Sequence, residues 1–494
     1  MSPTMQKMYI NGHWVAAVSG RTRKIINPSN QQQIAEVAEG GRDDAKAAIA
    51  AARQTFDSGV WSGQSGTARG VLLFRLAELI ERERETLAKL ESLDTGKTVE
   101  ESRWDMDDIA GIFRYYAGLA DKDAGEVIDS PVADSSSIVV REPVGVCGQI
   151  SPWNYPLLQA AWKLAPALAA GCTVVMKPSE ITPLTTIRVT ELAIEAGFPE
   201  GVINTVLGPG VSVGAELSES PDVDLISFTG SLLTGKAIMR AASGNVKKVA
   251  LELGGKNPNI IFADADLDTA LDYALNGVFF HAGQICSAGC RLMVEESIHD
   301  SFVARLKERM KKIRIGDGFS AETQMGPLVS AEHRAKVENY VKIAQEEGAR
   351  LELGGKRPEE AELQAGFFYL PTLFTGCTND MRIVQEEVFG PVISVETFSS
   401  ETEVMNRANS TIYGLSAGFW TRNPDRIHRL TKGLRFGTVW VNDFNVYFTQ
   451  APWGGYKQSG LGRELGRSGL EEYTEVKHIF HNHSPKPINW FGVQ

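Results

Sequence analysis

Helical periodicity dominates the first third of the chain. Apolar residues recur three or four positions apart in three successive windows. This spacing places them on one face of a helix. We therefore predict amphipathic helices over 43–56, 67–90 and 99–119, which pack against another part of the protein.

From residue 144 onward, short runs rich in β-branched residues alternate with helical windows. Strands separated by crossover helices are typical of βαβ units and a parallel sheet. The predicted strands fall into two series, 144–150, 173–176, 202–207, 225–228 and 246–251, then 259–262, 291–294, 392–398 and 438–442. Two series predict an α/β protein with two domains.

Two segments fit neither series. The segment 124–141 is polar and β-rich without a helical period, and 475–494 ends with Trp490 and Phe491 in a tail that could not bury them alone. Segments of this kind usually dock on another subunit. We therefore expect a homo-oligomer.

Composition and charge exclude several classes of protein. The 494 residues are 43% hydrophobic and 22% charged, as in ordinary globular domains, and the net charge is −11. Such a balance disfavours nucleic acid as a partner, and the densest basic run, 309–314, is interpreted as a helix terminus. No run approaches about 20 apolar residues, and the N-terminus lacks the apolar core of a signal peptide. We expect a cytoplasmic protein without a membrane partner.

The five cysteines are an odd number spread along the chain, which argues against a disulfide framework. Cys286 and Cys290 form a C-x3-C pair, but no second Cys or His pair completes a zinc site, and the polar tail holding His481 and His483 is a poor metal site. We expect no metal held by side chains. Individual thiols remain candidates for chemistry.

Glycine-rich turns follow two of the predicted strands. The run 230–237 nearly matches the P-loop pattern G-x-x-x-x-G-K-[ST], but Ala237 lacks the hydroxyl that binds magnesium, which counts against a phosphotransferase. A glycine turn between strand and helix still suits a dinucleotide pyrophosphate. The run 208–214 is one residue too long for the standard dinucleotide pattern.

Lys177 and Glu180 follow the predicted strand 173–176, at the edge where open α/β sheets bind ligands. Either side chain can hydrogen-bond a ribose hydroxyl. Glu180 would repel a 2′-phosphate, which favours NAD over NADP.

Three further residues supply the parts of a covalent mechanism. Cys286 is flanked by small residues at the end of an apolar segment, so it is a candidate nucleophile. Glu252 is a candidate base, and the Asn154 side-chain amide is a candidate oxyanion donor.

Seven ordered blocks carry a family resemblance. They are 152–156 (PWNYP), 177–180 (KPSE), 228–231 (FTGS), 252–256 (ELGGK), 283–286 (GQIC), 386–391 (EEVFGP) and 452–460 (PWGGYKQSG). Over essentially its whole length the chain resembles the NAD(P)-dependent aldehyde dehydrogenase superfamily.

The resemblance implies roles for individual residues. Cys286 attacks the aldehyde to form a thiohemiacetal, Asn154 and the Cys286 backbone N–H hold its oxyanion, and Glu252 activates water to hydrolyse the resulting thioester. Glu464 resembles the carboxylate that relays the proton away from Glu252. The implied cofactor-binding residues include Lys177 and Glu180 at the adenine ribose, Ser231 at the pyrophosphate, and Glu387 with Phe389 at the nicotinamide ribose and ring. The others are Ser151, Trp153, Ser179, Gly210, Gly214, Phe228, Gly230 and Leu253.

Within the superfamily, the amino-acid sequences of 441–444 (VNDF) and 456–460 (YKQSG) most resemble those of betaine aldehyde dehydrogenases, particularly bacterial ones. The aromatic residues Tyr155, Trp162 and Trp453 fit a cage for a trimethylammonium group, and Phe280 and Tyr447 would complete its wall. Many aldehyde dehydrogenases use aromatic tunnels for apolar aldehydes, so a general substrate remains an alternative. Bacterial members often carry histidine-proline at 445–446, where this chain has Asn-Val, which leaves an ω-aminoaldehyde open as well.

The same resemblance implies a Rossmann-like NAD-binding domain (1–123 and 143–254), a catalytic domain (255–453) and β oligomerisation arms (124–142 and 470–494). It implies NAD as cofactor, with NADP weaker, and a homotetramer built as a dimer of dimers. Several betaine aldehyde dehydrogenases use potassium, whose ligands are mostly backbone carbonyls that leave no sequence pattern. The alternative class is a thiol hydrolase, because family members show esterase activity through the same cysteine. A helical 286–290 segment would also bring Cys290 near enough for a reversible disulfide.

Overall fold

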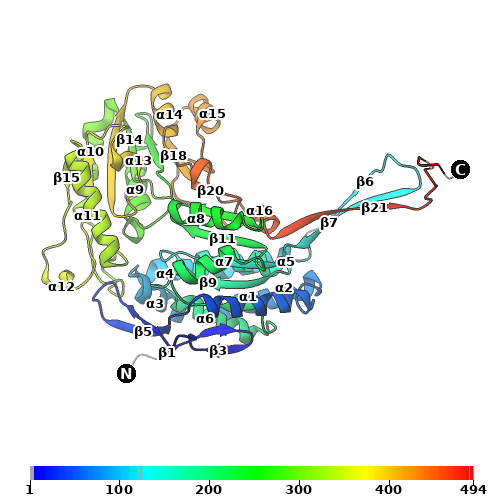
Figure 1. Cartoon of the computed structure of the whole chain (residues 1–494). Coiled ribbons are helices and arrows are strands. Elements are labelled where there is room, and N and C mark those ends of the chain that lie inside the picture. The colour runs from blue at the N-terminus through cyan, green and yellow to red at the C-terminus, as the bar shows by residue number, and fades with distance from the viewer. Residues whose placement is uncertain (1–4, 123–124, 489, 493–494) are drawn as a thin grey trace.

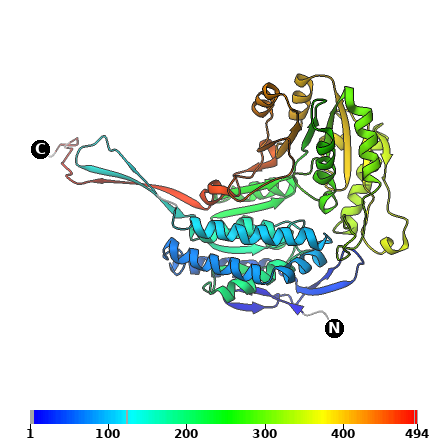
Figure 2. The same cartoon turned by 180° about the vertical axis from the view of Figure 1, so that it is seen from behind.

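The computed structural model describes residues 5–122, 125–488 and 490–492. Two large sheets, each with helices on its faces, form the body of the molecule, and a thin ribbon projects from it (Figures 1 and 2). The predicted mixed α/β class is confirmed.

The first sheet has eight strands in the order β20-β12-β11-β8-β9-β10-β2-β3. Its five central strands are parallel, and the remaining three pair antiparallel at the two edges. The central strands match the first predicted series and are β8 (Val146–Ile150), β9 (Thr173–Lys177), β10 (Ile203–Thr205), β11 (Leu225–Gly230) and β12 (Lys248–Leu253). The edge strands are β2 (Met8–Ile10), β3 (His13–Val15) and β20 (Gly460–Leu461).

Helices cover both faces of this sheet because each carries an apolar face, as the periodicity predicts (Figure 2). The predicted helix over 67–90 is wrong in one respect, since the chain breaks at Glu83 into two helices. The helices are α1 (Arg42–Asp57), α2 (Gly66–Arg82), α3 (Arg84–Thr95), α4 (Val99–Leu119), α5 (Pro156–Ala170), α6 (Leu184–Ala196), the π-helical turn η1 (Gly210–Gly214), α7 (Ala215–Glu219) and α8 (Leu232–Ala242). Sequence analysis missed a small sheet near the N-terminus, formed by β1 (Met5–Gln6), β4 (Thr22–Ile26) and β5 (Gln33–Ala38).

The second sheet has seven strands in the order β15-β16-β17-β14-β13-β18-β19, parallel except for β15. Four match the second predicted series: β13 (Pro258–Ile261), β14 (Arg291–Glu295), β17 (Val392–Phe398) and β19 (Thr438–Val441). Three were not predicted: β15 (Arg350–Leu353), β16 (Thr372–Thr375) and β18 (Ser416–Trp420). The accompanying helices are α9 (Leu267–Phe279), η2 (Phe280–Gly283), η3 (Glu296–Ile298), α10 (His299–Met310), α11 (Ala331–Glu346), α12 (Ala361–Gln364), α13 (Arg382–Gln385), α14 (Glu401–Asn409) and α15 (Pro424–Gly433).

The projecting ribbon joins the two segments that fitted neither series. Strand β7 (Ser135–Pro143) pairs antiparallel with β21 (Thr474–Asn482) along its whole length and with β6 (Glu126–Ile128) on its other side. Figure 1 shows the ribbon leaving the body with the C-terminus near its tip. The connecting elements are η4 (Lys457–Ser459) and α16 (Gly466–Glu471).

Candidate active site

The three candidate catalytic residues line one cavity between the two sheets. Asn154 follows β8 and Glu252 lies near the end of β12 in the first sheet, whereas Cys286 belongs to the loop before β14 of the second. Parallel strands end at the same edge of a sheet, so Asn154 and Glu252 meet although they are far apart in sequence. The loop before β14 of the second sheet brings Cys286 to the same cavity. The structure therefore brings together the proposed nucleophile, base and oxyanion donor.

Hydrogen bonds to its backbone carbonyl groups hold the nucleophile loop, residues 284–290, in place. Asn257 Nδ2 donates to Cys286 O at 2.8 Å and to Ala288 O at 3.1 Å. The loop is not helical, so the condition for placing Cys290 on an adjacent turn is not met, and the Cys290 side chain is buried in the core of the second sheet. Burial raises the pKa of the Cys286 thiol to about 12, with the Glu387 and Glu252 carboxylates adding to the shift.

Asn154 both anchors this loop and faces the cavity. Its Nδ2 donates to the carbonyl of Gln284, two residues before Cys286, at 2.8 Å. A side-chain amide carries two N–H groups, so one remains for an oxygen in the cavity. This matches what an oxyanion donor requires.

Glu252 is buried and its Oε2 has no hydrogen-bond partner in the protein. Burial raises the pKa of this carboxyl well above its ordinary value, and the nearby Glu464 raises it further. Glu464 lies behind Glu252, outside the cavity, in an ion pair with the buried Lys163 on α5. Lys163 Nζ also donates to Thr229 Oγ1 at 2.6 Å. Sequence analysis missed Lys163, although a lysine inside an apolar helix was a visible signal.

A cleft of about 720 Å³ adjoins the catalytic cavity along the ends of β9 and β11. Lys177 Nζ and Glu180 Oε2 lie 3.3 Å apart at one end, and Ser231 caps the N-terminus of α8 at the other. The predicted cofactor residues that line it are Ser151, Trp153, Lys177, Ser179, Glu180, Gly210, Gly214, Phe228, Gly230 and Ser231. A helix N-terminus offers free N–H groups to a pyrophosphate, so these residues fit a dinucleotide.

The position of helix α8 also counts against a P-loop at 230–237. Gly235 and Lys236 lie inside α8, which begins four residues before Lys236, rather than in a phosphate-binding loop. The lysine side chain is exposed and does not line the cleft.

Leu253, Glu387 and Phe389, the remaining predicted cofactor residues, line the catalytic cavity rather than the cleft. Gly255 N donates to Glu387 Oε1 at 3.1 Å, and a Cβ at Gly254 would come within 2.2 Å of the Glu387 carboxylate, which favours glycine at position 254. Burial raises the pKa of Glu387 to about 7, opposed by the charge of Lys336.

An aromatic group that includes one unpredicted residue surrounds Phe389. His333 Nε2 donates to Phe389 O at 2.7 Å, and the Trp153 ring packs against both His333 and Phe389, with centroids at 4.9 and 5.3 Å. His333 and Lys336 come from α11, and no local motif marked them.

A second cavity opens on the other side of Cys286, and all five predicted substrate residues line it: Tyr155, Trp162, Phe280, Tyr447 and Trp453. The rings of Trp162, Tyr447 and Trp453 lie 5.4 to 6.2 Å apart and meet edge to face. We call the five predicted substrate residues together the aromatic cage.

Acidic residues that sequence analysis missed line the same cavity. Tyr447 OH donates to Asp108 Oδ2 at 2.6 Å. Burial raises the pKa of Asp105 to about 7, opposed by the ammonium of Lys97, which bonds Asp105 at 2.6 Å. The Lys97 ammonium also lies 4.1 Å from the centroid of the Tyr155 ring, so Asp105 and one face of Tyr155 already contact a cation. The cavity still offers the other aromatic faces and the Asp108 carboxylate to a bound cation.

Asn445, part of the Asn-Val pair at 445–446, also lines this cavity. Its backbone has a φ of 69°, and its Oδ1 accepts a hydrogen bond from Ser287, the residue after the nucleophile. Asn445 therefore touches the reacting end of the tunnel.

Neither a metal cluster nor a membrane span is evident in the described part of the chain. No group of three or more His, Cys, Asp or Glu side chains there is placed to hold a metal ion. None of the described helices is long and apolar enough to cross a membrane.

Comparisons with known proteins agree with this geometry. The Aldehyde dehydrogenase family pattern matches residues 14–479, so the chain belongs to the aldehyde dehydrogenase family. Betaine aldehyde dehydrogenase of Bacillus subtilis (strain 168) is 67% identical, with 99% of each chain covered, and the peroxisomal aminoaldehyde dehydrogenase 2 of Pisum sativum is 46% identical, with 99% and 98% covered. A crystal structure of Staphylococcus aureus betaine aldehyde dehydrogenase with NAD+ is 57% identical over 99% of this chain and 97% of that one, with a TM-score of 0.98.

Proposed function

We propose that this protein oxidises betaine aldehyde to glycine betaine with NAD, through a thioester on Cys286. The observation that carries the substrate is the aromatic cage, which opens directly onto Cys286 and has carboxylates beside it. The Bacillus subtilis and Staphylococcus aureus relatives support the proposal.

Cys286 and Asn154 perform the first step in this mechanism. The Cys286 sulfur bonds to the aldehyde carbon, and the Asn154 amide with the Cys286 backbone N–H stabilises the resulting oxyanion. Bound NAD supplies the positive ring charge that favours the thiolate and the carbon that accepts the hydride. The product of that oxidation is a thioester on Cys286.

Glu252 performs the second step, with support from residues behind it. Its carboxylate takes a proton from water, whose oxygen attacks the thioester and releases the carboxylate product and the Cys286 thiol. Glu464, which is ion-paired with Lys163, helps to relay this proton away from Glu252. Overall, aldehyde, NAD+ and water give carboxylate, NADH and two protons.

Glu180 is proposed to select NAD over NADP. We expect Glu180→Ala to raise the NADP to NAD ratio of kcat/KM about tenfold, worth about 1.4 kcal/mol, because the carboxylate no longer repels a 2′-phosphate. Initial rates with both cofactors measure this. Glu219→Gln, which changes another carboxylate on the same cleft, is the control and should shift the ratio far less. An unchanged ratio in Glu180→Ala would contradict this role.

The cage makes a prediction about substrate charge. Betaine aldehyde should exceed 3,3-dimethylbutanal, its uncharged isostere, by at least about tenfold in kcat/KM, because a desolvated cation–π contact is worth about 2 kcal/mol. Trp453→Ala should erase that margin, whereas Trp14→Ala on the distant β3 should keep it. Initial rates of NADH formation decide the matter. Equal rates for the two aldehydes with the unmodified protein would mean that the tunnel is merely apolar.

An ω-aminoaldehyde is the second candidate substrate. Asp105 and Asp108 favour it because a primary ammonium needs hydrogen-bond acceptors that a trimethylammonium does not. The aminoaldehyde dehydrogenase of Pisum sativum supports this candidate. Including 4-aminobutanal in the same assay separates the two.

We further propose a homotetramer assembled through the arms 124–142 and 470–494, with cofactor-binding (1–123 and 143–254) and catalytic (255–453) domains. The ribbon supports assembly because Val127, Ile479 and Phe480 are exposed on it. A potassium site and a cytoplasmic location stay predictions.

A further inference from the structure

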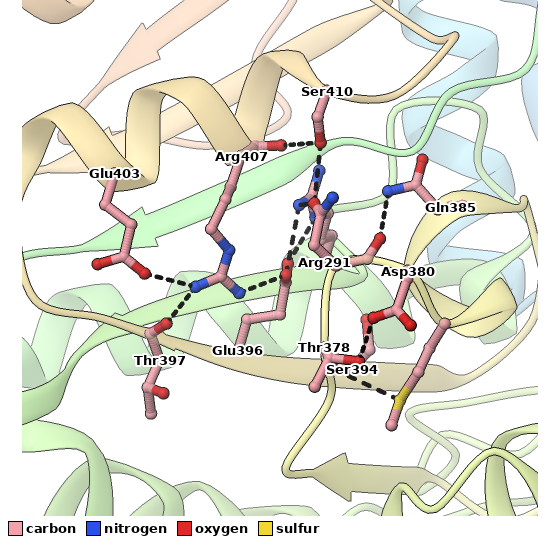
Figure 3. Close-up of polar contacts among 12 residues, drawn as sticks. Arg291, Thr378, Asp380, Gln385, Ser394, Glu396, Thr397, Glu403, Arg407 and Ser410 are labelled. Atoms are coloured by element: carbon pink, nitrogen blue, oxygen red, sulfur yellow. Dashed lines mark hydrogen bonds and ion pairs between the residues drawn. The ribbon is translucent and has the colours of Figure 1, made fainter.

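A chain of hydrogen bonds outside the pocket joins the nucleophile loop to the loop that carries Glu387 (Figure 3). Arg291 directly follows Cys290, at the end of the nucleophile loop, and its Nη2 donates to Asn379 Oδ1 at 2.9 Å. Gln385 Nε2 donates to Asn379 O at 2.5 Å. Gln385 lies two residues before Glu387, so Asn379 is the common partner of both loops.

The Arg291 end of this link is rigid. Arg291 Nε donates to Glu396 Oε2 at 2.6 Å, and both side chains are fully buried. Arg407 Nη2 donates to the other oxygen of Glu396 at 2.7 Å, which fixes the carboxylate from a second side (Figure 3). Moving either member of a buried ion pair leaves a charge without a partner, which is costly. Asn379 is therefore hydrogen-bonded to a fixed point.

The other end of the link carries the residues at the nicotinamide end of the cleft. Glu387 is bonded to Gly255 N, two residues after the end of β12, and Phe389 is bonded to His333 on α11. Gln385 is a further attachment of this short segment, beside Tyr340, whose OH donates to Glu386 Oε2 at 2.8 Å. The strand after this segment, β17, is also bonded to the end of the nucleophile loop, because Ser394 N donates to Cys290 O at 2.9 Å. The Gln385 attachment adds a side-chain connection on the near side of Glu387, so it helps to set the nicotinamide loop relative to the nucleophile.

We propose that Asn379 is a positioning residue: by joining Arg291 to Gln385, it fixes the Glu387–Phe389 loop relative to Cys286 and thereby orients the bound nicotinamide. The inference rests on the proposed function. Asn379 itself lines neither cavity beside Cys286, so its action passes through Gln385 and the loop. Its side chain is partly exposed, so the fold does not depend on it as a core residue.

Two activities of the same cysteine test this role. Asn379→Ala and Gln385→Leu each break one bond of the link, and we expect at least threefold increases in KM for NAD and in the NADH Kd measured by fluorescence. Hydrolysis of p-nitrophenyl acetate without NAD needs Cys286 but no nicotinamide, and should stay within twofold. Asn379→Asp keeps both acceptor oxygens and should restore ordinary cofactor binding.

Ser410→Ala is the matched control. Ser410 Oγ also donates to Asn379 Oδ1, at 2.8 Å, but it is exposed and leads to neither loop. It should change none of these quantities. Unchanged cofactor binding in both link variants, or a parallel loss of esterase and dehydrogenase activity, would overturn the proposal. If the unmodified protein formed no NADH from any of the aldehydes, the proposed function would be refuted. The NADH Kd of the link variants, compared with that of the unmodified protein, would still test the role of Asn379.

Discussion

Cys286→Ser is expected to lower kcat for aldehyde oxidation by at least about 10⁴-fold, because removing a covalent nucleophile removes the reaction path itself. A serine hydroxyl at this place has no paired base, since Glu252 lies across the cavity rather than in a hydrogen bond with residue 286. NADH absorbance at 340 nm measures the loss. Ester hydrolysis without NAD should disappear with it, because both activities use the same sulfur.

Two control measurements distinguish loss of the nucleophile from damage to the fold. The NADH Kd of Cys286→Ser should match that of the unmodified protein, since the cofactor cleft lies on the first sheet. Cys290→Ser, at a buried thiol four residues away, should retain most of the activity. A Cys286→Ser enzyme that keeps more than about one hundredth of its activity would require a different nucleophile.

The three candidate catalytic residues, which line one cavity, could be proposed from sequence because each is carried by a local motif. Glu252 and Asn154 stand in runs whose glycines and prolines mark strand ends, and parallel strands end together at one edge of the first sheet. Cys286 stands in a glycine-flanked run just before a strand of the second sheet. The structure gives a physical reason for one such run, since a Cβ at Gly254 would collide with Glu387. Glycines in such motifs mark positions where another part of the chain comes close to the backbone, so the sequence itself indicates them.

The supporting residues could not be predicted in this way, because tertiary contacts alone define them. His333 lies on an ordinary amphipathic helix, and Asp105 lies on another, with nothing local to mark either. They reach the cavities only once α11 and α4 have packed. Lys163 is the exception, because a lysine within an otherwise apolar helix already indicates a buried partner.

Missed elements of the fold have comparable causes. Strand β18 reads SAGFW, without the β-branched residues that identified its neighbours, and its pairing comes from β13 and β19 on either side. The break between α2 and α3 at Glu83 interrupts a continuous apolar periodicity, so the pattern alone favoured one helix. In both cases packing overrides local propensity.

Glu252→Gln should separate the two halves of the reaction. The oxidation step needs Cys286 and the oxyanion donors, whereas thioester hydrolysis needs a base for water. We therefore expect a burst of about one NADH per active site, followed by a steady rate lowered about 10²- to 10⁴-fold. Stopped-flow absorbance resolves the burst, and mass spectrometry of the quenched protein should find the acyl group on Cys286.

The environment of Glu252 explains why glutamine is the informative replacement. It keeps the volume of a buried side chain whose Oε2 has no partner, yet it cannot accept a proton. Glu464→Gln should slow the steady rate less, because Glu464 acts through Glu252 and lies outside the cavity. If Glu252→Gln showed no burst, the Glu252 carboxylate would be needed before hydride transfer. It would then act as the base for the Cys286 thiol rather than for water.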